Sequence, residues 1–115
     1  MFNFFEKEEE KYQIMVLNNH SILSGEFRPR GPAEARDIFK EVFESWKPCQ
    51  KYIFDISNVK YMNSCVQVVL SKICIEGQSF TTEPIIVIKK GSRVQESFAY
   101  SLEKSNKKFS VIEKS

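Results

Sequence analysis

The alternation of short apolar runs with amphipathic stretches constrains this chain more than any other feature. Two strand-like segments, at residues 12–17 and 21–27, are followed by helical and strand patterns that alternate to the C-terminus. The expected order of elements is β-β-α-β-α-β-α-β. A helix of crossover length precedes each of the three later strands, and such connections join parallel strands. The sequence therefore predicts an α/β fold, with helices packed on a mixed or mainly parallel sheet.

The strands are predicted from runs of apolar and β-branched residues. The first two strands form a hairpin that turns at Asn18, Asn19 and His20. Gly25, in the second strand, marks a bulge or a close approach of backbone. The later strands are predicted at residues 51–59, 83–88 and 109–112, and a loop is expected at residues 60–63.

The helices are predicted from apolar positions that recur every three or four residues. The first begins at Pro32 and stops before Pro48. Its apolar face comprises Ala35, Ile38, Phe39, Val42, Phe43 and Trp46. The second helix is capped by Asn63 or Ser64 and ends near Gly77, a predicted C-cap. The third carries an apolar stripe of Val94, Phe98, Ala99, Tyr100 and Leu102.

The length of 115 residues is that of one domain. We assign residues 12–115 to this domain and residues 1–11 to an N-terminal arm. The arm carries Phe2, Phe4 and Phe5 ahead of an acidic run. Exposed phenylalanines at this density are unfavourable, so we expect the arm to dock on its own domain or on a second copy in a homodimer. A disordered tail is the alternative.

Composition excludes several classes of protein. A net charge of +2 does not indicate a nucleic-acid partner. No stretch approaches the roughly 20 apolar residues of a membrane-spanning helix, and the start lacks the pattern of a signal peptide. Cys49, Cys65 and Cys74 are odd in number and form no C-x-x-C pair. We therefore expect free thiols and a cytoplasmic protein.

The sequence also offers little for catalysis. His20 is the only histidine, and no spacing typical of metal ligands is present. The chain has no phosphate-binding glycine loop and no G-x-S-x-G nucleophile motif. We expect no enzyme activity, no cofactor and no metal. The alternative is an enzyme that uses Cys65 or Asp55.

Residues 53–70 carry a more specific pattern. They read Ile-Phe-Asp-Ile-Ser-Asn-Val-Lys-Tyr-Met-Asn-Ser-Cys-Val-Gln-Val-Val-Leu. This segment resembles the signature of STAS domains, the group that includes the bacterial anti-sigma factor antagonists. In such domains a strand ending in Asp-(Leu/Ile)-Ser leads into a short loop, and Asp-Ser-(Ser/Ala)-Gly opens the next helix. The spacing from Asp55 to Ser64 fits that pattern without gaps, and the element order fits from about residue 12 to residue 112.

The resemblance implies a regulatory domain that binds other proteins and switches between partners in signal transduction. In the phosphorylatable members a partner serine kinase modifies the serine that is here Ser64. The implied partners are an anti-sigma factor or a related serine kinase, and an effector protein. The implied contact residues at the start of the second helix are Tyr61, Met62, Asn63, Ser64, Cys65, Val66 and Gln67. The implied contact surface also takes in the exposed side of the helix at residues 64–76 and the neighbouring residues 28–31. Asp55 is either a hydrogen-bond anchor for the loop or a polar residue at a strand end.

Two positions depart from the STAS pattern. Asn63 stands where the family usually has Asp. Asparagine keeps the capping geometry of aspartate but lacks its carboxylate. Val66 stands where the family usually has Gly, and it fills a place where a partner's backbone would approach. These departures favour an alternative, in which the chain is a non-phosphorylated STAS subunit of a transporter or a signalling assembly. Ser64 would then only cap the helix.

Overall fold

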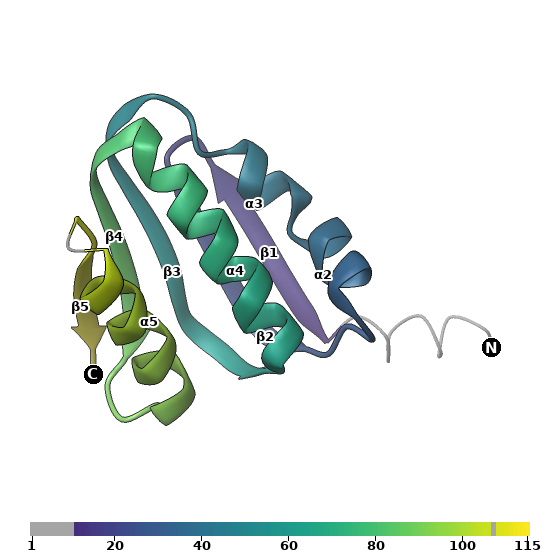
Figure 1. The fold of residues 1–115 in the computed structure, drawn as a ribbon. Coiled ribbons are helices and arrows are strands. Elements are labelled where there is room, and N and C mark those ends of the chain that lie inside the picture. Colours follow the sequence, from purple (N-terminus) through teal and green to yellow (C-terminus); the bar gives the residue numbers. More distant parts are fainter. Residues whose placement is uncertain (1–10, 107) are drawn as a thin grey trace.

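A five-stranded mixed sheet carries a layer of helices on one face (Figure 1). The computed structural model describes residues 11–106 and 108–115. The strands are β1 (Tyr12–Leu17), β2 (His20–Phe27), β3 (Cys49–Met62), β4 (Thr81–Lys89) and β5 (Ser110–Lys114), and they lie in the order of the sequence. β1 runs antiparallel to β2, and all other neighbours are parallel. The predicted α/β fold with a mixed sheet is confirmed. The predicted arm lies, except for Lys11, outside the described residues.

The helices share one face because the connections step in one direction. They are α2 (Pro32–Ile38), α3 (Lys40–Glu44), α4 (Ser64–Gly77) and α5 (Arg93–Ser105), and a short 3-10 helix, η1 (Gln78–Phe80), follows α4. The chain passes from β2 to β3, β4 and β5, each next to the last. Right-handed crossovers that all step the same way place every helix on the same side, as Figure 1 shows.

The hydrophobic core lies between the sheet and the helix layer. It takes alternate residues of the strands, among them Leu23 on β2, Phe54 on β3 and Ile86 on β4. Trp46 and Tyr52 stack within this core, with ring centroids 3.8 Å apart. The opposite face of the sheet carries no helix in the described part of the chain.

The first predicted helix is broken, so the expectation of one continuous helix is wrong. Phe39, with φ −99° and ψ 15°, separates α2 from α3. The Phe39 N–H still donates to the Ala35 carbonyl, and the Phe43 N–H to the Phe39 carbonyl, so helical hydrogen bonds continue across the break. Phe43, predicted on the apolar face, is nevertheless 47% exposed, whereas Phe39, Val42 and Trp46 are buried.

β3 is longer than predicted, because the expected loop at residues 60–62 continues the strand. The pairing of β2 with β3 contains two register shifts, and β3 supplies one extra residue at each. The second shift lies next to Gly25, which has φ +93°. A Cβ at Gly25 would lie 2.2 Å from the Lys11 carbonyl oxygen, so the predicted close approach of backbone is confirmed.

Gly77 is not the C-cap that its position suggested. It is the last residue of α4 and has the ordinary right-handed conformation, with φ −71°. A Cβ at Gly77 would lie 2.3 Å from Cδ2 of Trp46. The glycine therefore allows α4 to pack closely against the Trp46 ring.

Gln95 joins β3 to β4 where the two strands separate. Their pairing ends at Asp55 and Val87. Gln95, on α5, is fully buried there. Its Nε2 donates to the Val59 carbonyl at 2.8 Å, and its Oε1 accepts from the Lys89 N–H at 2.6 Å. One side chain thus satisfies backbone groups on both strands.

Candidate protein-binding site at the start of helix α4

Asn63 is the residue that caps α4. Its Oδ1 accepts from the Val66 N–H at 3.1 Å, and its backbone is extended, as an N-cap requires. Its Nδ2 donates to the Pro29 carbonyl at 2.9 Å. Asn63 therefore starts the helix and also ties the segment at residues 28–31 to it.

Ser64 is the first residue of α4, and its side chain is exposed. Because Asn63 supplies the cap, the helix does not need the Ser64 hydroxyl for this purpose. That hydroxyl makes no hydrogen bond with any residue that the structure describes. Ser64 is therefore not the residue that caps α4, which was its alternative role.

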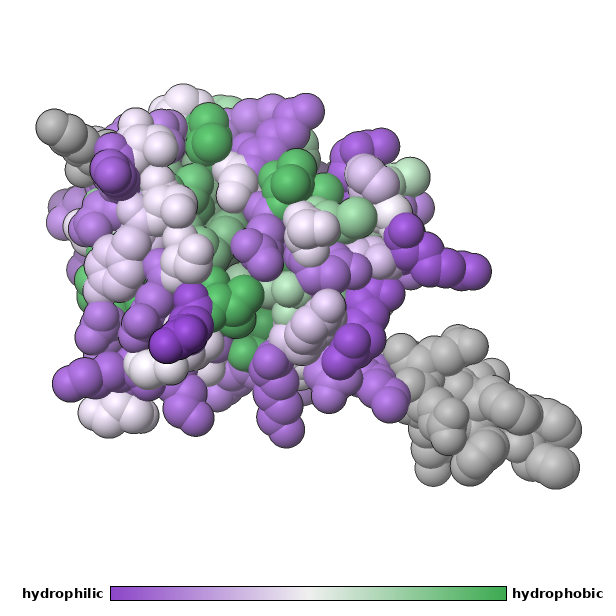
Figure 2. All heavy atoms as spheres, turned by 60° about the horizontal axis from the view of Figure 1, so that its bottom comes forward, coloured by the Kyte–Doolittle hydropathy of each residue, from purple (hydrophilic) through white to green (hydrophobic). Residues whose placement is uncertain are grey.

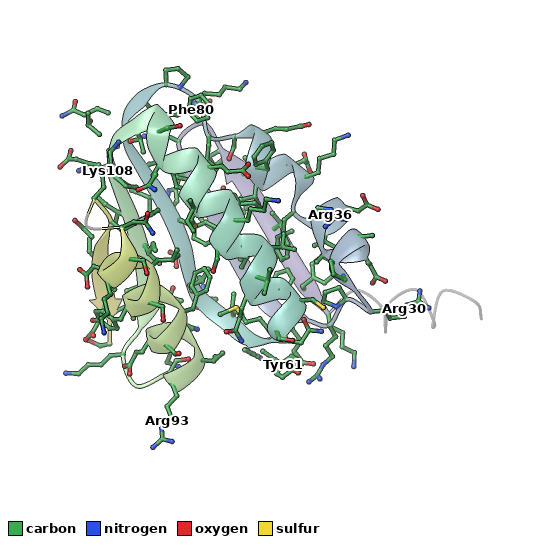
Figure 3. The ribbon with its side chains drawn as sticks, in the orientation of Figure 1. Arg30, Arg36, Tyr61, Phe80, Arg93 and Lys108 are labelled. Carbon is green, nitrogen blue, oxygen red and sulfur yellow. The ribbon has the colours of Figure 1, made fainter. Side chains whose placement is uncertain are left out.

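Tyr61 and Arg28 form the surface beside Ser64. The guanidinium carbon of Arg28 lies 3.9 Å from the centroid of the Tyr61 ring, a cation–π contact. Arg28 Nε also pairs with Glu26 Oε1 at 3.2 Å. Figure 3 shows Tyr61 next to the beginning of α4. The segments at residues 28–31 and 61–64, which are distant in sequence, thus share one surface.

Two of the predicted contact residues are buried, and this corrects the expectation for both. Met62 is 2% exposed and Val66 is fully buried, because both side chains belong to the core. Val66 consequently does not cover the surface at the position where STAS domains usually have glycine. Cys65 and Gln67 are half-buried, so a partner would reach only part of each.

Asp55 lies away from this surface, in the middle of β3 between Ile22 and Val87. Its Oδ1 accepts from the Ser57 N–H at 2.9 Å and from the Ser57 hydroxyl at 2.6 Å. Its Oδ2 lies 3.5 Å from Lys114 Nζ. Asp55 therefore holds the backbone at Ser57, at the first register shift of β3. It is neither an anchor for residues 60–63 nor a residue at a strand end, the two roles that the sequence left open.

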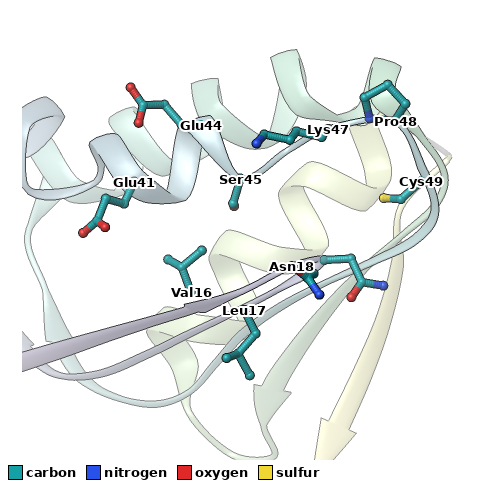
Figure 4. A pocket seen from close by; sticks show the side chains of 10 residues that line it. Val16, Leu17, Asn18, Glu41, Glu44, Ser45, Lys47, Pro48 and Cys49 are labelled. Atoms are coloured by element: carbon teal, nitrogen blue, oxygen red, sulfur yellow. The ribbon is translucent and has the colours of Figure 1, made fainter.

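A hollow of about 480 Å³ lies where the β1–β2 turn approaches the end of α3 (Figure 4). Ser45, in its wall, and Ser21 both hydrogen-bond to the Tyr52 hydroxyl, with Ser21 at 2.5 Å. Burial raises the pKa of Tyr52. The hydroxyls of Ser21, Ser45 and Tyr52 make hydrogen bonds with one another, so we assign them a structural role.

The residues named for the enzyme alternative lie on different elements, Cys65 on α4 and Asp55 on β3. Successive side chains of a strand point to opposite faces of the sheet. Ser21 on β2 is buried in the core under the helices, so the neighbouring His20 lies on the face away from the helices. Cys65 lies on α4, across the sheet from this imidazole. Among the described residues, no group of His, Cys, Asp and Glu is arranged to hold a metal ion.

Comparisons with known proteins do not identify this chain. Neither a scan against models of protein families nor a search of curated proteins finds a match. Among the described residues, no helix is long and apolar enough to cross a membrane.

Proposed function

We propose that this chain is a STAS-like regulatory domain that binds other proteins and changes partner when Ser64 is phosphorylated. The observation that carries the proposal is the position of Ser64. Its side chain is exposed at the first residue of a 14-residue helix, and the neighbouring Asn63 makes the cap. Ser64 can therefore be modified without removing a hydrogen bond that starts the helix.

Phosphorylation at this place has a direct physical effect. A phosphoserine carries about −1.5 to −2 charges at neutral pH. The N–H groups and the dipole at the start of α4 stabilise that charge on the free domain. In a complex, the phosphate would have to lose water and would repel acidic groups on the partner. The modification would thus weaken one interface without refolding the domain.

The proposed partners are an anti-sigma factor or a related serine kinase, and an effector protein. The contact surface comprises Tyr61, Ser64 and the accessible parts of Asn63, Cys65 and Gln67. Residues 28–31 extend it, because the Asn63–Pro29 hydrogen bond holds them alongside. A bacterial cytoplasm as the setting is part of this proposal.

The first test is mass spectrometry of the protein isolated from its native cells together with its partners. We expect a phosphate on Ser64 in one fraction and an unmodified chain in the complex. The identified partner is then titrated with Ser64→Asp and with Ser101→Asp, a matched exposed serine on α5. We expect the Ser64 variant to bind at least about tenfold more weakly, which corresponds to about 1.4 kcal/mol. Equal binding by both variants would contradict the switch.

One observation favours the alternative of a non-phosphorylated subunit. The Asn63 amide accepts from Val66 and donates to Pro29, and an aspartate of the usual STAS pattern would lose the donor. This arrangement serves structure without any kinase. A stable complex in which Ser64 is never phosphorylated in cells would support this alternative.

A further inference from the structure

An apolar groove of about 410 Å³ runs between α4 and the α2–α3 segment. Its apolar lining comprises Phe39, Phe43, Val68, Val69 and Ile73. Two of its apolar residues face solvent, since Val68 is 66% and Phe43 is 47% exposed. Figure 2 shows hydrophobic patches in the middle of the molecular surface, surrounded by hydrophilic residues. A concave apolar surface with a polar rim has the shape and chemistry to hold the apolar side chains of another molecule.

The rim of the groove is basic. Arg36 on α2, Lys40 on α3 and Lys72 on α4 line it, and Glu76 is its one acidic lining residue. None of the three cations forms an ion pair with a residue that the structure describes. Figure 3 shows Arg36 on α2, in the helix layer. The groove thus presents an apolar floor and unpaired positive charge to an approaching molecule.

The groove adjoins the proposed phosphorylation site. Ser64, Val68 and Lys72 are spaced four residues apart on α4, so they share one face of that helix. Ser64 lies one turn before Val68. A ligand in the groove would therefore lie close to any charge placed on Ser64.

We propose that this groove binds an acidic amphipathic helix of the partner protein. Its apolar side chains pack on Phe43 and Val68, and its Asp and Glu residues lie opposite Arg36, Lys40 and Lys72. This mode is the insertion of a helix into a groove. The inference rests on the proposed function, and it explains the direction of the switch, because a phosphate on Ser64 would repel an acidic helix.

The charges on the rim argue against a second copy as the occupant. A two-fold contact places the same patch on both subunits. Arg36, Lys40 and Lys72 would then approach the same cations of the other copy, and like charges facing each other disfavour such a contact.

The probe is a synthetic amphipathic peptide of about 18 residues, long enough to be helical, with a leucine face and glutamate flanks. A second peptide has lysine in place of each glutamate. Each is added to the isotope-labelled full chain and followed by NMR. We expect the acidic peptide to shift amide signals of α2, α3 and α4 around the groove, and to bind at least tenfold more tightly than the basic peptide.

The variants are Val68→Ser and the double charge reversal Lys40→Glu with Lys72→Glu. The matched control is Ile75→Ser, because Ile75 is exposed on α4 but does not line the groove. We expect each groove variant to weaken peptide binding at least tenfold, and the control to leave it unchanged. Equal affinity for the two peptides, signal shifts elsewhere on the surface, or dimerisation that requires Val68 would overturn the inference.

Ser64→Asp separates this inference from the proposed function. One outcome is that the peptide binds the groove and Ser64→Asp leaves both the peptide and the native partner bound. This would support the groove as a binding site and contradict the phosphorylation switch. The other outcome is that Ser64→Asp releases the native partner while Val68→Ser leaves the affinity for that partner unchanged. This would support the phosphorylation switch and contradict the groove as the partner's binding site.

Discussion

At the scale of single residues, Gly77 shows how packing selects an amino acid. Its backbone conformation is open to any residue, so conformational freedom does not explain the glycine. The reason is the Trp46 ring, which occupies the space of a Cβ at 2.3 Å. Trp46 is itself fixed by stacking on Tyr52, so it has little freedom to move aside.

We therefore expect Gly77→Ala to lower the free energy of unfolding by about 1–3 kcal/mol, the usual effect of overpacking a core. Urea unfolding, followed by the fluorescence of the single tryptophan, measures it. Gly31→Ala is the control, because a Cβ at Gly31 would meet nothing within 4 Å. Similar losses of stability in the two variants would contradict this explanation.

Tyr100 provides a prediction about pH. Its hydroxyl donates to the Glu113 carboxylate, which raises the pKa of Tyr100 from 10.0 to about 12. The protonated hydroxyl makes the hydrogen bond, so the bond stabilises the folded protein fully at pH values below the pKa that Tyr100 has in the unfolded chain. This stabilisation is lost as the pH rises through the higher pKa of the folded state. We expect the native protein to melt at a higher temperature than Tyr100→Phe up to about pH 10. The difference should vanish towards pH 12, and a constant difference would show that the hydrogen bond is not its cause.

At the scale of elements, the start of α4 depends on one side chain that makes two hydrogen bonds. Asn63 caps the helix through Oδ1 and holds Pro29 through Nδ2. Removal of the first contact destabilises the helix, and removal of the second releases residues 28–31 from the proposed interface. The proposed site is thus organised by a residue that need not itself be modified.

We expect Asn63→Ala to lower the free energy of unfolding by about 1 kcal/mol, the usual value of an N-cap. Asn63→Asp keeps an oxygen for the Val66 N–H and adds a charge that the helix dipole favours. We therefore expect it to lower the free energy of unfolding by less than Asn63→Ala does. Chemical denaturation of the three proteins makes the comparison. A loss for Asn63→Asp as large as that for Asn63→Ala would show that the Pro29 contact matters more than the cap.

At the scale of the whole molecule, one hydrophobic core connects every layer. Residues of β2, β3 and β4 and of all four helices belong to the same buried cluster, and Val16 of β1 and Val111 of β5 pack against it. Gln95 adds hydrogen bonds that connect α5 to the diverging strands β3 and β4. No part of the described chain therefore has a separate core.

We consequently expect unfolding in one cooperative step, as is usual for single domains of this size. Far-UV circular dichroism and the fluorescence of Trp46 should give the same midpoint in urea. Tryptophan fluorescence that changes before the secondary structure is lost would indicate that the α2–α3 segment unfolds on its own.

Several features could be read from the sequence because they depend on neighbours in the chain. Apolar periodicity indicates strands and helices locally, so the order of the five strands, the helical segments between them and the α/β class were predicted correctly. The choice between Asn63 and Ser64 as the cap stayed open, because both residue types cap helices. The break at Phe39 was missed, since its residues continue a regular helical repeat.

The sequence by itself determined the order of the strands, the alternation of strands with helical segments and the position of Ser64 near a helix start. Tertiary structure alone decided that Gln95 is buried, that Gly77 makes room for Trp46, and that Met62 and Val66 point into the core. It also brought Phe43 and Val68 to one groove. The physical reason is that each of these features depends on atoms from elements that are distant along the chain, and a local pattern carries no information about them.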